Sequence, residues 1–324
     1  MNPAVPYTAS GRTASAPAIH EVTGAAQRLF WGAILIIVGL WLAGMPLNTP
    51  AVQTAALVLM LLGGLPHGGY DAALFIRLWG SGHRAFAAFI GGYLALCAVM
   101  LLFWQIAPVA ALGLFLILSA SHFADDWAEL PDRLLRVCAG ASVIAAPAIG
   151  QPDGVAALFV ALGGPEAVWL ARIATAAAPV VLLVALAGVG IAWRQGQRER
   201  AAALIAMLAV LLIVPPLLGF AIFFALLHAP RHMRMAARLI DLRVPTMALS
   251  GWALAALSVL LWWLLQPLIS VPDAAVTGAW AFQLLSVLVV PHFLCSAWAE
   301  RHVACVRPGP NGMFQISEAQ PRPR

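Results

Sequence analysis

The sequence predicts an all-α protein, a polytopic transmembrane bundle of about 8–10 membrane segments. Of its 324 residues, 62% are hydrophobic and only 10% are charged. Such a composition leaves too few polar side chains to cover a surface exposed to water. The apolar residues also gather in runs that approach the roughly 20 residues a helix needs to cross the hydrocarbon core of a bilayer. The chain is therefore expected to be an integral membrane protein.

The clearest spans are apolar runs with few charges inside them. They are 29–46, 51–67, 85–106, 108–126, 134–149, 167–193, 246–269 and 277–298. Two further stretches are ambiguous: 154–163 is short, and 201–227 is interrupted by Pro215 and Pro216. Proline lacks the backbone N–H that a helix uses, and its ring clashes with the preceding turn, so a helix must stop or kink there.

The two ends of the chain lack apolar runs of this kind. Residues 1–28 are rich in Pro, Ser, Thr, Ala and Gly, which predicts a disordered cytoplasmic tail rather than a cleavable signal peptide. Residues 304–324 are expected to be a second disordered tail. Residues 29–303 are then expected to form one transmembrane helical domain.

Arginine indicates which side of the bundle faces the cytoplasm. All 18 basic residues are arginine, and with 13 acidic residues they give a formal net charge of +5, spread too thinly to indicate nucleic-acid binding. The arginines fall in alternate connections between the apolar runs. Because cytoplasmic loops carry the arginine excess, we expect a multi-pass protein of the cell inner membrane with both termini in the cytoplasm. Arginine-rich loops flank 201–227 on both sides, so that stretch should form a re-entrant hairpin with Pro215 and Pro216 at its tip.

Several histidines lie inside apolar runs or at their ends, where an ionisable side chain is costly and usually marks function. They are His67, His122, His228, His232 and His292. In the predicted orientation, four separate segments bring these residues to a similar depth, which is how helical bundles build metal sites. The remaining histidines, His20, His83 and His302, lie in tails or loops and need no functional explanation.

His228 and His232 are four residues apart, so both rings should lie on one helix face and could chelate one metal ion. The alternative is that they form a basic interfacial patch with Arg231 and Arg234. Imidazole suits Fe, Zn or Cu. No cysteine or glutamate accompanies the histidines closely, and the four cysteines show neither disulfide nor metal-site spacing. An all-histidine site for a single metal ion is therefore expected.

Carboxylates follow two of these histidines closely. We expect Asp71 and Asp126 to orient the histidines that precede them, His67 and His122, by accepting an imidazole N–H. The remaining acids after His122 are expected to belong to a solvated loop; they are Asp125, Glu129 and Asp132.

Glycines and aromatic residues near the histidines allow two interpretations each. The glycines around His67 predict either a simple helix break or a close approach by another helix; they are Gly63, Gly64, Gly68 and Gly69. The aromatic residues either line an apolar cavity or are ordinary packing; they are Phe123, Trp127, Phe223 and Phe224.

At these motifs the sequence resembles the Brp/Blh family, the integral-membrane bacterial and archaeal β-carotene 15,15'-dioxygenases that supply retinal to microbial rhodopsins. The resemblance rests on HGGYD at 67–71, HFADD at 122–126, HAPRH at 228–232 and PH at 291–292. It covers most of the hydrophobic chain. At residue 124 this chain has alanine where glycine is expected in many relatives.

The resemblance implies that His67, His122, His228 and His232 bind non-haem Fe(II), and that His292 has a catalytic role near the iron. The enzyme would be an oxidoreductase that adds O2 across the central 15,15' double bond of β-carotene, giving two molecules of all-trans-retinal. Residues 29–303 would be the catalytic domain. β-Carotene would enter from the lipid bilayer, and a microbial rhodopsin could receive the retinal.

Two other classes of protein use histidines within membranes. A di-iron lipid or carotenoid hydroxylase, desaturase or ketolase needs more histidines, including adjacent pairs, and this chain has no His-His pair. A transporter or a haem-binding membrane protein uses histidines as proton relays or axial ligands. A Soret band in the purified protein would identify haem.

Overall fold

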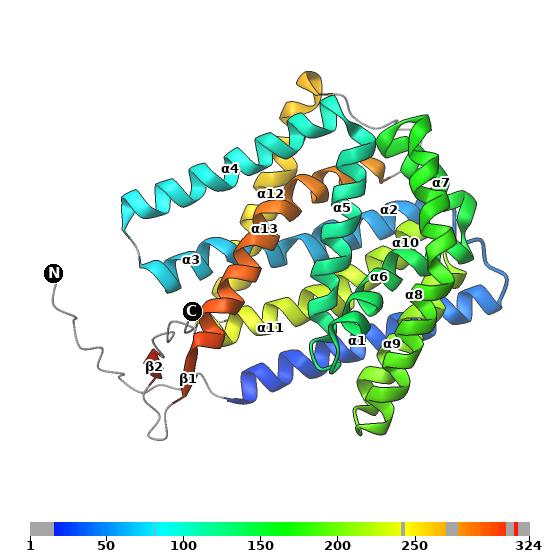
Figure 1. Ribbon diagram of the computed structural model, residues 1–324, viewed down its shortest axis with the longest axis horizontal. Helices are drawn as coiled ribbons and strands as arrows, with labels where there is room; N and C mark the ends of the chain where they lie inside the picture. The colour runs from blue at the N-terminus through cyan, green and yellow to red at the C-terminus, as the bar shows by residue number, and fades with distance from the viewer. Residues whose placement is uncertain (1–15, 81, 241–243, 270–277, 309–313, 317–324) are drawn as a thin grey trace, which may run out of the picture.

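The computed structural model describes residues 16–80, 82–240, 244–269, 278–308 and 314–316, and Figure 1 shows them as a bundle of helices. Turns aside, the described chain departs from helix at one antiparallel pair of short strands, β1 (Val306–Pro308) and β2 (Phe314–Ile316). The longest helices are α1 (Ala16–Leu42), α4 (His83–Ile106), α6 (Arg133–Gly150), α8 (Val168–Arg194), α12 (Val244–Leu265) and α13 (Ala279–Cys305).

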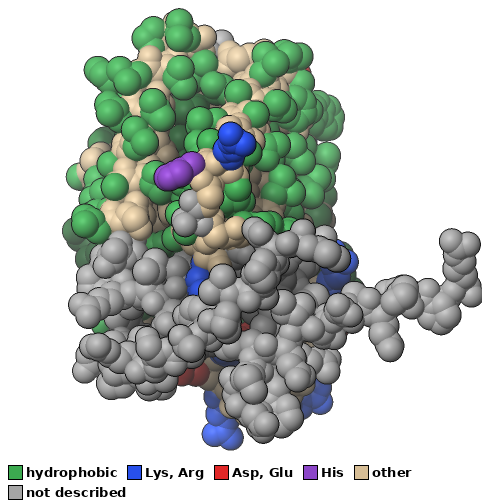
Figure 2. All heavy atoms as spheres, turned by 90° about the vertical axis from the view of Figure 1, so that its left-hand side faces the viewer, with side chains coloured by type: hydrophobic (Ala, Val, Ile, Leu, Met, Phe, Trp, Pro, Cys, Tyr) green, Lys and Arg blue, Asp and Glu red, His purple; other side chains and the backbone are tan. Residues whose placement is uncertain are grey.

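Eight of the described helical stretches are long and apolar enough to cross a membrane, which confirms the predicted polytopic bundle. They are Gly24–Leu42, Pro50–Arg77, His83–Ile106, Pro108–Trp127, Arg133–Gly150, Pro165–Arg194, Leu249–Leu268 and Ala279–Trp298. Large apolar side chains stand exposed on their outer faces; on α4, Leu94 and Leu102 are each 57% exposed. Figure 2 shows a face whose described side chains are mostly hydrophobic. Such a surface suits lipid rather than water.

The second span changes its helical geometry three times. It begins as α2 (Pro50–Leu59), passes through a π-helical turn η1 (Met60–Gly64) and a 3₁₀ turn η2 (Leu65–Tyr70), and ends as α3 (Asp71–Trp79). The glycines permit close approach: a Cβ at Gly64 would lie 2.0 Å from the Phe224 ring, and one at Gly69 would lie 2.6 Å from the Gly251 backbone. The chain stays helical here, and the close approach that the glycines predicted is present.

Residues 198–240 make the reversal predicted at Pro215 and Pro216. Helix α9 (Arg198–Ile213) ends before the two prolines, and the chain continues as α10 (Pro216–Ile222), η5 (Phe223–His228) and α11 (Ala229–Ile240). Near the start of α9, Arg200 pairs with Glu129, which follows the turn η3 (Ala124–Trp127). On the return, Arg231 donates to the Asp126 carbonyl at 2.6 Å. Both arms of this segment therefore contact one turn, and the prolines lie at the far tip.

The other ambiguous stretch, 154–163, lies in the short helix α7 (Pro152–Gly163). At its start, Gly154 faces Pro216 at the hairpin tip, and at its end Gly163 faces the carbonyl of Pro108, where α5 (Pro108–Phe123) begins. Both of its ends thus lie at the same end of the bundle, so α7 does not make a crossing. The connection to α8 is the single turn η4 (Pro165–Ala167), and η6 (Gln266–Leu268) follows α12.

Regular secondary structure extends into both segments that were expected to be tails. Helix α1 starts at Ala16, inside the 1–28 segment expected to be a tail, and residues 1–15 lie outside the described part. At the other end, α13 reaches Cys305, and the strands follow it within the expected tail 304–324. The remaining residues of that tail are not described.

Candidate metal centre

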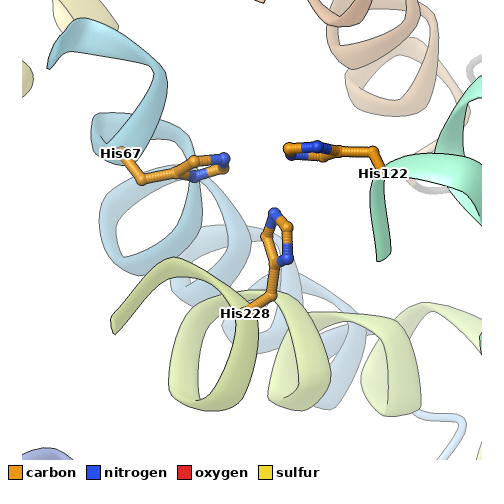
Figure 3. A group of neighbouring side chains, drawn as sticks. All are labelled: His67, His122 and His228. Carbon is orange, nitrogen blue, oxygen red and sulfur yellow. The ribbon is translucent and has the colours of Figure 1, made fainter. Parts of the chain in front are cut away.

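The five histidines singled out from the sequence meet in one place, which we call the histidine cluster. His67 comes from η2, His122 from α5, His228 from η5, His232 from α11 and His292 from α13. None of them is more than 8% exposed. Figure 3 shows the rings of His67, His122 and His228 approaching a common centre from three different helical segments.

The rings in the cluster are close enough to share one ion. Measured ring-centroid distances run from 4.4 Å between His228 and His232 to 6.2 Å between His232 and His292. The ligand nitrogens of His67, His122 and His228 lie within 4.8 Å of one another, and so do those of His122, His232 and His292. Because His122 belongs to both triads, the five rings form one continuous group. The short His228–His232 distance agrees with the one-face arrangement predicted from their spacing.

Several ring nitrogens in the cluster are buried without a hydrogen-bond partner. They are Nδ1 and Nε2 of His122, Nε2 of His228 and Nε2 of His292. A buried polar atom without a partner is costly. A metal ion at the centre of the cluster would accept one lone pair from each of these three rings, so the residues present fit a bound metal.

The opposite nitrogens of three rings are held by hydrogen-bond acceptors. Nδ1 of His67 lies 2.5 Å from the Gly64 carbonyl, and Nδ1 of His228 lies 2.8 Å from an Asp126 carboxylate oxygen. Nδ1 of His292 lies 3.0 Å from both carboxylate oxygens of Asp71. An Nδ1–H that donates to such an acceptor leaves Nε2 as the lone-pair donor. Three of the rings are thereby set in the tautomer that presents Nε2.

The predicted pairing of acids with histidines was wrong in both cases. Asp71 was expected to hold His67 and holds His292 instead, while Asp126 was expected to hold His122 and holds His228. The physical reason is the local turn geometry. In η2 the chain turns the His67 Nδ1 back onto its own Gly64 carbonyl, so Asp71 is left to reach His292 on α13. Nδ1 of His122 has no hydrogen-bond partner, and Asp126 reaches His228 on η5 instead.

The other three acids near His122 have surface roles or a longer contact. Glu129 pairs with Arg200, and Asp132 accepts from the backbone N–H of Leu134 at 2.7 Å at the start of α6. Asp125 is 38% exposed at its side chain and lies 3.7 Å from Nδ1 of His122. This distance is too long for a hydrogen bond.

The aromatic residues near the cluster, Phe123, Trp127, Phe223 and Phe224, are buried and pack closely around it. The rings of Phe123, Phe223 and Phe224 lie 5.0, 5.8 and 5.6 Å from the His228 ring, and all three residues are buried. Trp127 lies under the guanidinium of Arg231 at 4.6 Å. The cluster therefore has a dense apolar wall on the side of η5.

Two residues that support the cluster were not assigned this role from the sequence. Tyr93 on α4 donates its hydroxyl to Asp71 at 3.1 Å, and no motif surrounds it. The sequence indicates Arg231 only as part of a basic patch, yet it donates to the Asp126 carbonyl. The HAPRH spacing was the available signal, because it places Arg231 one residue before a predicted ligand.

Three histidines were expected to have no functional role: His20, His83 and His302. His83 starts α4 and is exposed, while the side chains of His20 and His302 lie outside the described part. Among the described cysteines, Cys97, Cys138 and Cys295 are free thiols.

Comparison with known proteins identifies one family. Residues 58–300 match the family described as beta-carotene 15,15'-dioxygenase, a range that includes all five histidines of the cluster. A curated protein named beta-carotene 15,15'-dioxygenase, from the uncultured marine bacterium 66A03, is 28% identical over 197 residues, covering 56% of this chain and 68% of the relative. No solved structure matches the chain.

Proposed function

The chain belongs to the beta-carotene 15,15'-dioxygenase family, and we propose that it is an iron-dependent enzyme that cleaves the central 15,15' double bond of β-carotene. One O2 adds across that bond, the carbon–carbon bond breaks, and each half keeps one oxygen atom as an aldehyde. The products are two molecules of all-trans-retinal. The observation that carries the proposal is the buried five-histidine cluster, whose ring nitrogens without hydrogen-bond partners could hold a metal ion.

His67, His122, His228 and His232 are the proposed ligands of Fe(II). An all-imidazole set is neutral and suits iron as well as zinc or copper, and the choice of iron rests on the family. Bound Fe(II) supplies the redox chemistry by which O2 reacts with a carbon–carbon double bond. His292, which is held by Asp71, is proposed to act beside the ligands.

The protein's own contribution is to fix the orientation of these imidazole rings and to keep water away from them. Asp126 keeps His228 turned toward the centre, and the Gly64 carbonyl does the same for His67. The apolar wall of Phe123, Phe223 and Phe224 excludes water from the cluster, which would protect reactive species from side reactions.

Membrane location suits this chemistry because β-carotene dissolves in lipid. We place both termini in the cytoplasm of the cell that carries the protein in its inner membrane, following the arginine distribution. A microbial rhodopsin is the proposed receiver of the retinal.

Expression in a bacterium that accumulates β-carotene tests the activity directly. We expect loss of the orange colour and the appearance of retinal by chromatography. The control is the His122→Ala variant, which should leave the cells orange. If wild-type cells stay orange and form no retinal, the proposed substrate is wrong. A Soret band in the purified protein would favour a haem protein instead.

A further inference from the structure

A cavity of about 620 Å³ lies between α3, α4 and α13. Its volume is typical of small-molecule sites, and the three helices pack against one another around it. Its lining is mostly apolar and includes six aromatic rings, those of Phe75, Trp79, Phe89, Tyr93, Phe293 and Trp298.

Most of these aromatic rings present parallel faces. Phe75 stacks on Phe89 with ring centroids 4.4 Å apart, and on Trp79 at 4.9 Å. Trp79 stacks in turn on Trp298. The row joins all three helices and gives the cavity an aromatic wall, which suits contact with a conjugated hydrocarbon.

The polar groups at the cavity wall already have partners. Tyr93 donates its hydroxyl to Asp71, and Asp71 also accepts from Nδ1 of His292. A ligand with a charged or strongly polar head would find these groups occupied. The cavity is therefore suited to a ligand that is apolar along its length.

One end of the cavity lies beside residues that adjoin the histidine cluster, although no histidine of the cluster lines it. Asp71 and Pro291 line it, and both adjoin His292 by hydrogen bond or by sequence. Phe293, also in the lining, has its ring 6.2 Å from that of His122. From Asp71 to Trp79 the lining follows the length of α3, about 12 Å at 1.5 Å per residue.

The wall formed by α4 contains two small residues one turn apart, Ala88 and Gly92. A Cβ at Gly92 would meet no atom within 4 Å, so there is open space beside it. Leu294, across the cavity on α13, is 51% exposed. The cavity thus reaches the apolar outer surface of the bundle, where lipid lies.

We propose that this cavity binds one half of the carotenoid, which enters sideways from the bilayer past α4. The end ring lies near Trp79 and Trp298, and the polyene runs along α3 so that its central bond reaches the histidine cluster. The inference rests on the proposed function for the identity of the ligand. It adds the location of the substrate site. It also adds a reason for central cleavage: the length of the cavity along α3 sets which bond of the polyene reaches the histidine cluster.

The test compares Gly92→Phe with Gly91→Phe. Both glycines are exposed on α4, and a Cβ at either meets nothing within 4 Å, but only Gly92 lines the cavity. Each protein is purified with a chelator from cells that make β-carotene, and bound carotenoid is measured by absorbance. Retinal formation is then measured after Fe(II) is added back.

We expect Gly92→Phe to retain less carotenoid and to lose at least about tenfold in kcat/KM, the lower end of what one misfitting methylene costs in an apolar pocket. Any residual cleavage by Gly92→Phe should shift toward off-centre bonds, each of which gives one product longer and one product shorter than retinal. After Fe(II) is added back, the iron content of Gly92→Phe should equal that of wild type. Gly91→Phe should match wild type in all these measurements.

Equal binding and turnover by the two variants would overturn the cavity assignment. Wild-type protein that binds β-carotene and forms no retinal would instead contradict the proposed function, and the binding comparison would still decide the cavity. Should Gly92→Phe fail to fold, Ala88→Leu against Ala87→Leu gives the same comparison. Both alanines are exposed on α4, and only Ala88 lines the cavity.

Discussion

At the scale of single residues, the centre depends on which nitrogen of each imidazole is already engaged. Nδ1 of His67, His228 and His292 faces a carbonyl or carboxylate oxygen at 2.5–3.0 Å. Nε2 of His228 and of His292 is buried and has no such partner. His122 differs because both of its nitrogens lack a hydrogen bond. The ring of His122 belongs to both triads, so it is the one most dependent on a bound ion for its position.

Iron content measures the ligand assignment. We expect about one iron per chain in the wild-type protein. Most of this iron should be lost in each of four variants, because alanine offers no donor in place of imidazole: His67→Ala, His122→Ala, His228→Ala and His232→Ala. His292→Ala should keep part of its iron and lose turnover. The measurement is metal analysis of purified protein, with His83→Ala as the control because His83 is exposed at the start of α4. Full iron and full cleavage in two of the four variants would contradict the assignment.

The carboxylates should act through the rings they hold. We expect Asp126→Asn and Asp71→Asn to lower iron affinity or activity by about 10- to 100-fold, the usual effect of removing such a partner. Asp126→Asn should act mainly on iron retention, because His228 is a proposed ligand, and Asp71→Asn mainly on turnover through His292. The exposed Asp153 supplies the control variant Asp153→Asn. Wild-type behaviour of both test variants would show that the two carboxylates do not orient the rings.

At the scale of helices, the second span owes its position to backbone contact at glycine. The carbonyl of Pro66 lies 2.5 Å from where a Gly251 Cβ would stand, and Gly69 meets the backbone of Gly251 in the same way. Neither neighbour is a flexible side chain that could move aside. η2 and α12 therefore pack at a distance that only glycine permits, and this contact fixes the depth of His67.

Gly69→Ala tests this packing. We expect it to lower the free energy of unfolding by about 1–3 kcal/mol, the cost of overpacking in a close-packed interior, and to reduce iron content as His67 shifts. The measurement is thermal unfolding in detergent together with metal analysis. Gly91→Ala is the matched control, since a Cβ there meets nothing within 4 Å. Equal stability of the two variants would mean that η2 and α12 can separate without loss.

At the scale of the whole molecule, the site requires that η2, α5, the continuous run of η5 and α11, and α13 bring their histidines to one depth. The hairpin of α9 and α10 makes this possible, because it returns the chain to the η3 turn where Asp126 and Arg231 meet. Without a reversal at Pro215 and Pro216, His228 would emerge on the opposite side of the bundle from His122. The chain between His122 and His228 must therefore cross the membrane an even number of times for the two residues to share the cluster.

Accessibility of single cysteines in a cysteine-free background tests the topology. Gln197 and Asp241, of which Asp241 lies outside the described residues, should resist a membrane-impermeant reagent in intact cells. Asn48, in the arginine-free connection after α1, should react. Labelling at Gln197 would contradict the orientation taken from arginine, because Gln197 lies near Arg200, which pairs with Glu129. Labelling at Asp241 would place His228 away from His122 and exclude a shared ion.

The sequence by itself determined the helical membrane architecture, the break at Pro215 and Pro216, and the five histidines. Each of these depends on local features: apolar run length, the missing N–H of proline, and the cost of an ionisable group in lipid. It also predicted that Asp71 and Asp126 have imidazole partners, but only the tertiary structure decided which ones. Asp71 is 221 residues from His292, and Asp126 is 102 from His228. Such pairs depend on how separate helices dock, which residue spacing does not encode. The same holds for Tyr93 and for the cavity beside Gly92, because a cavity is the space that three packed helices leave between them.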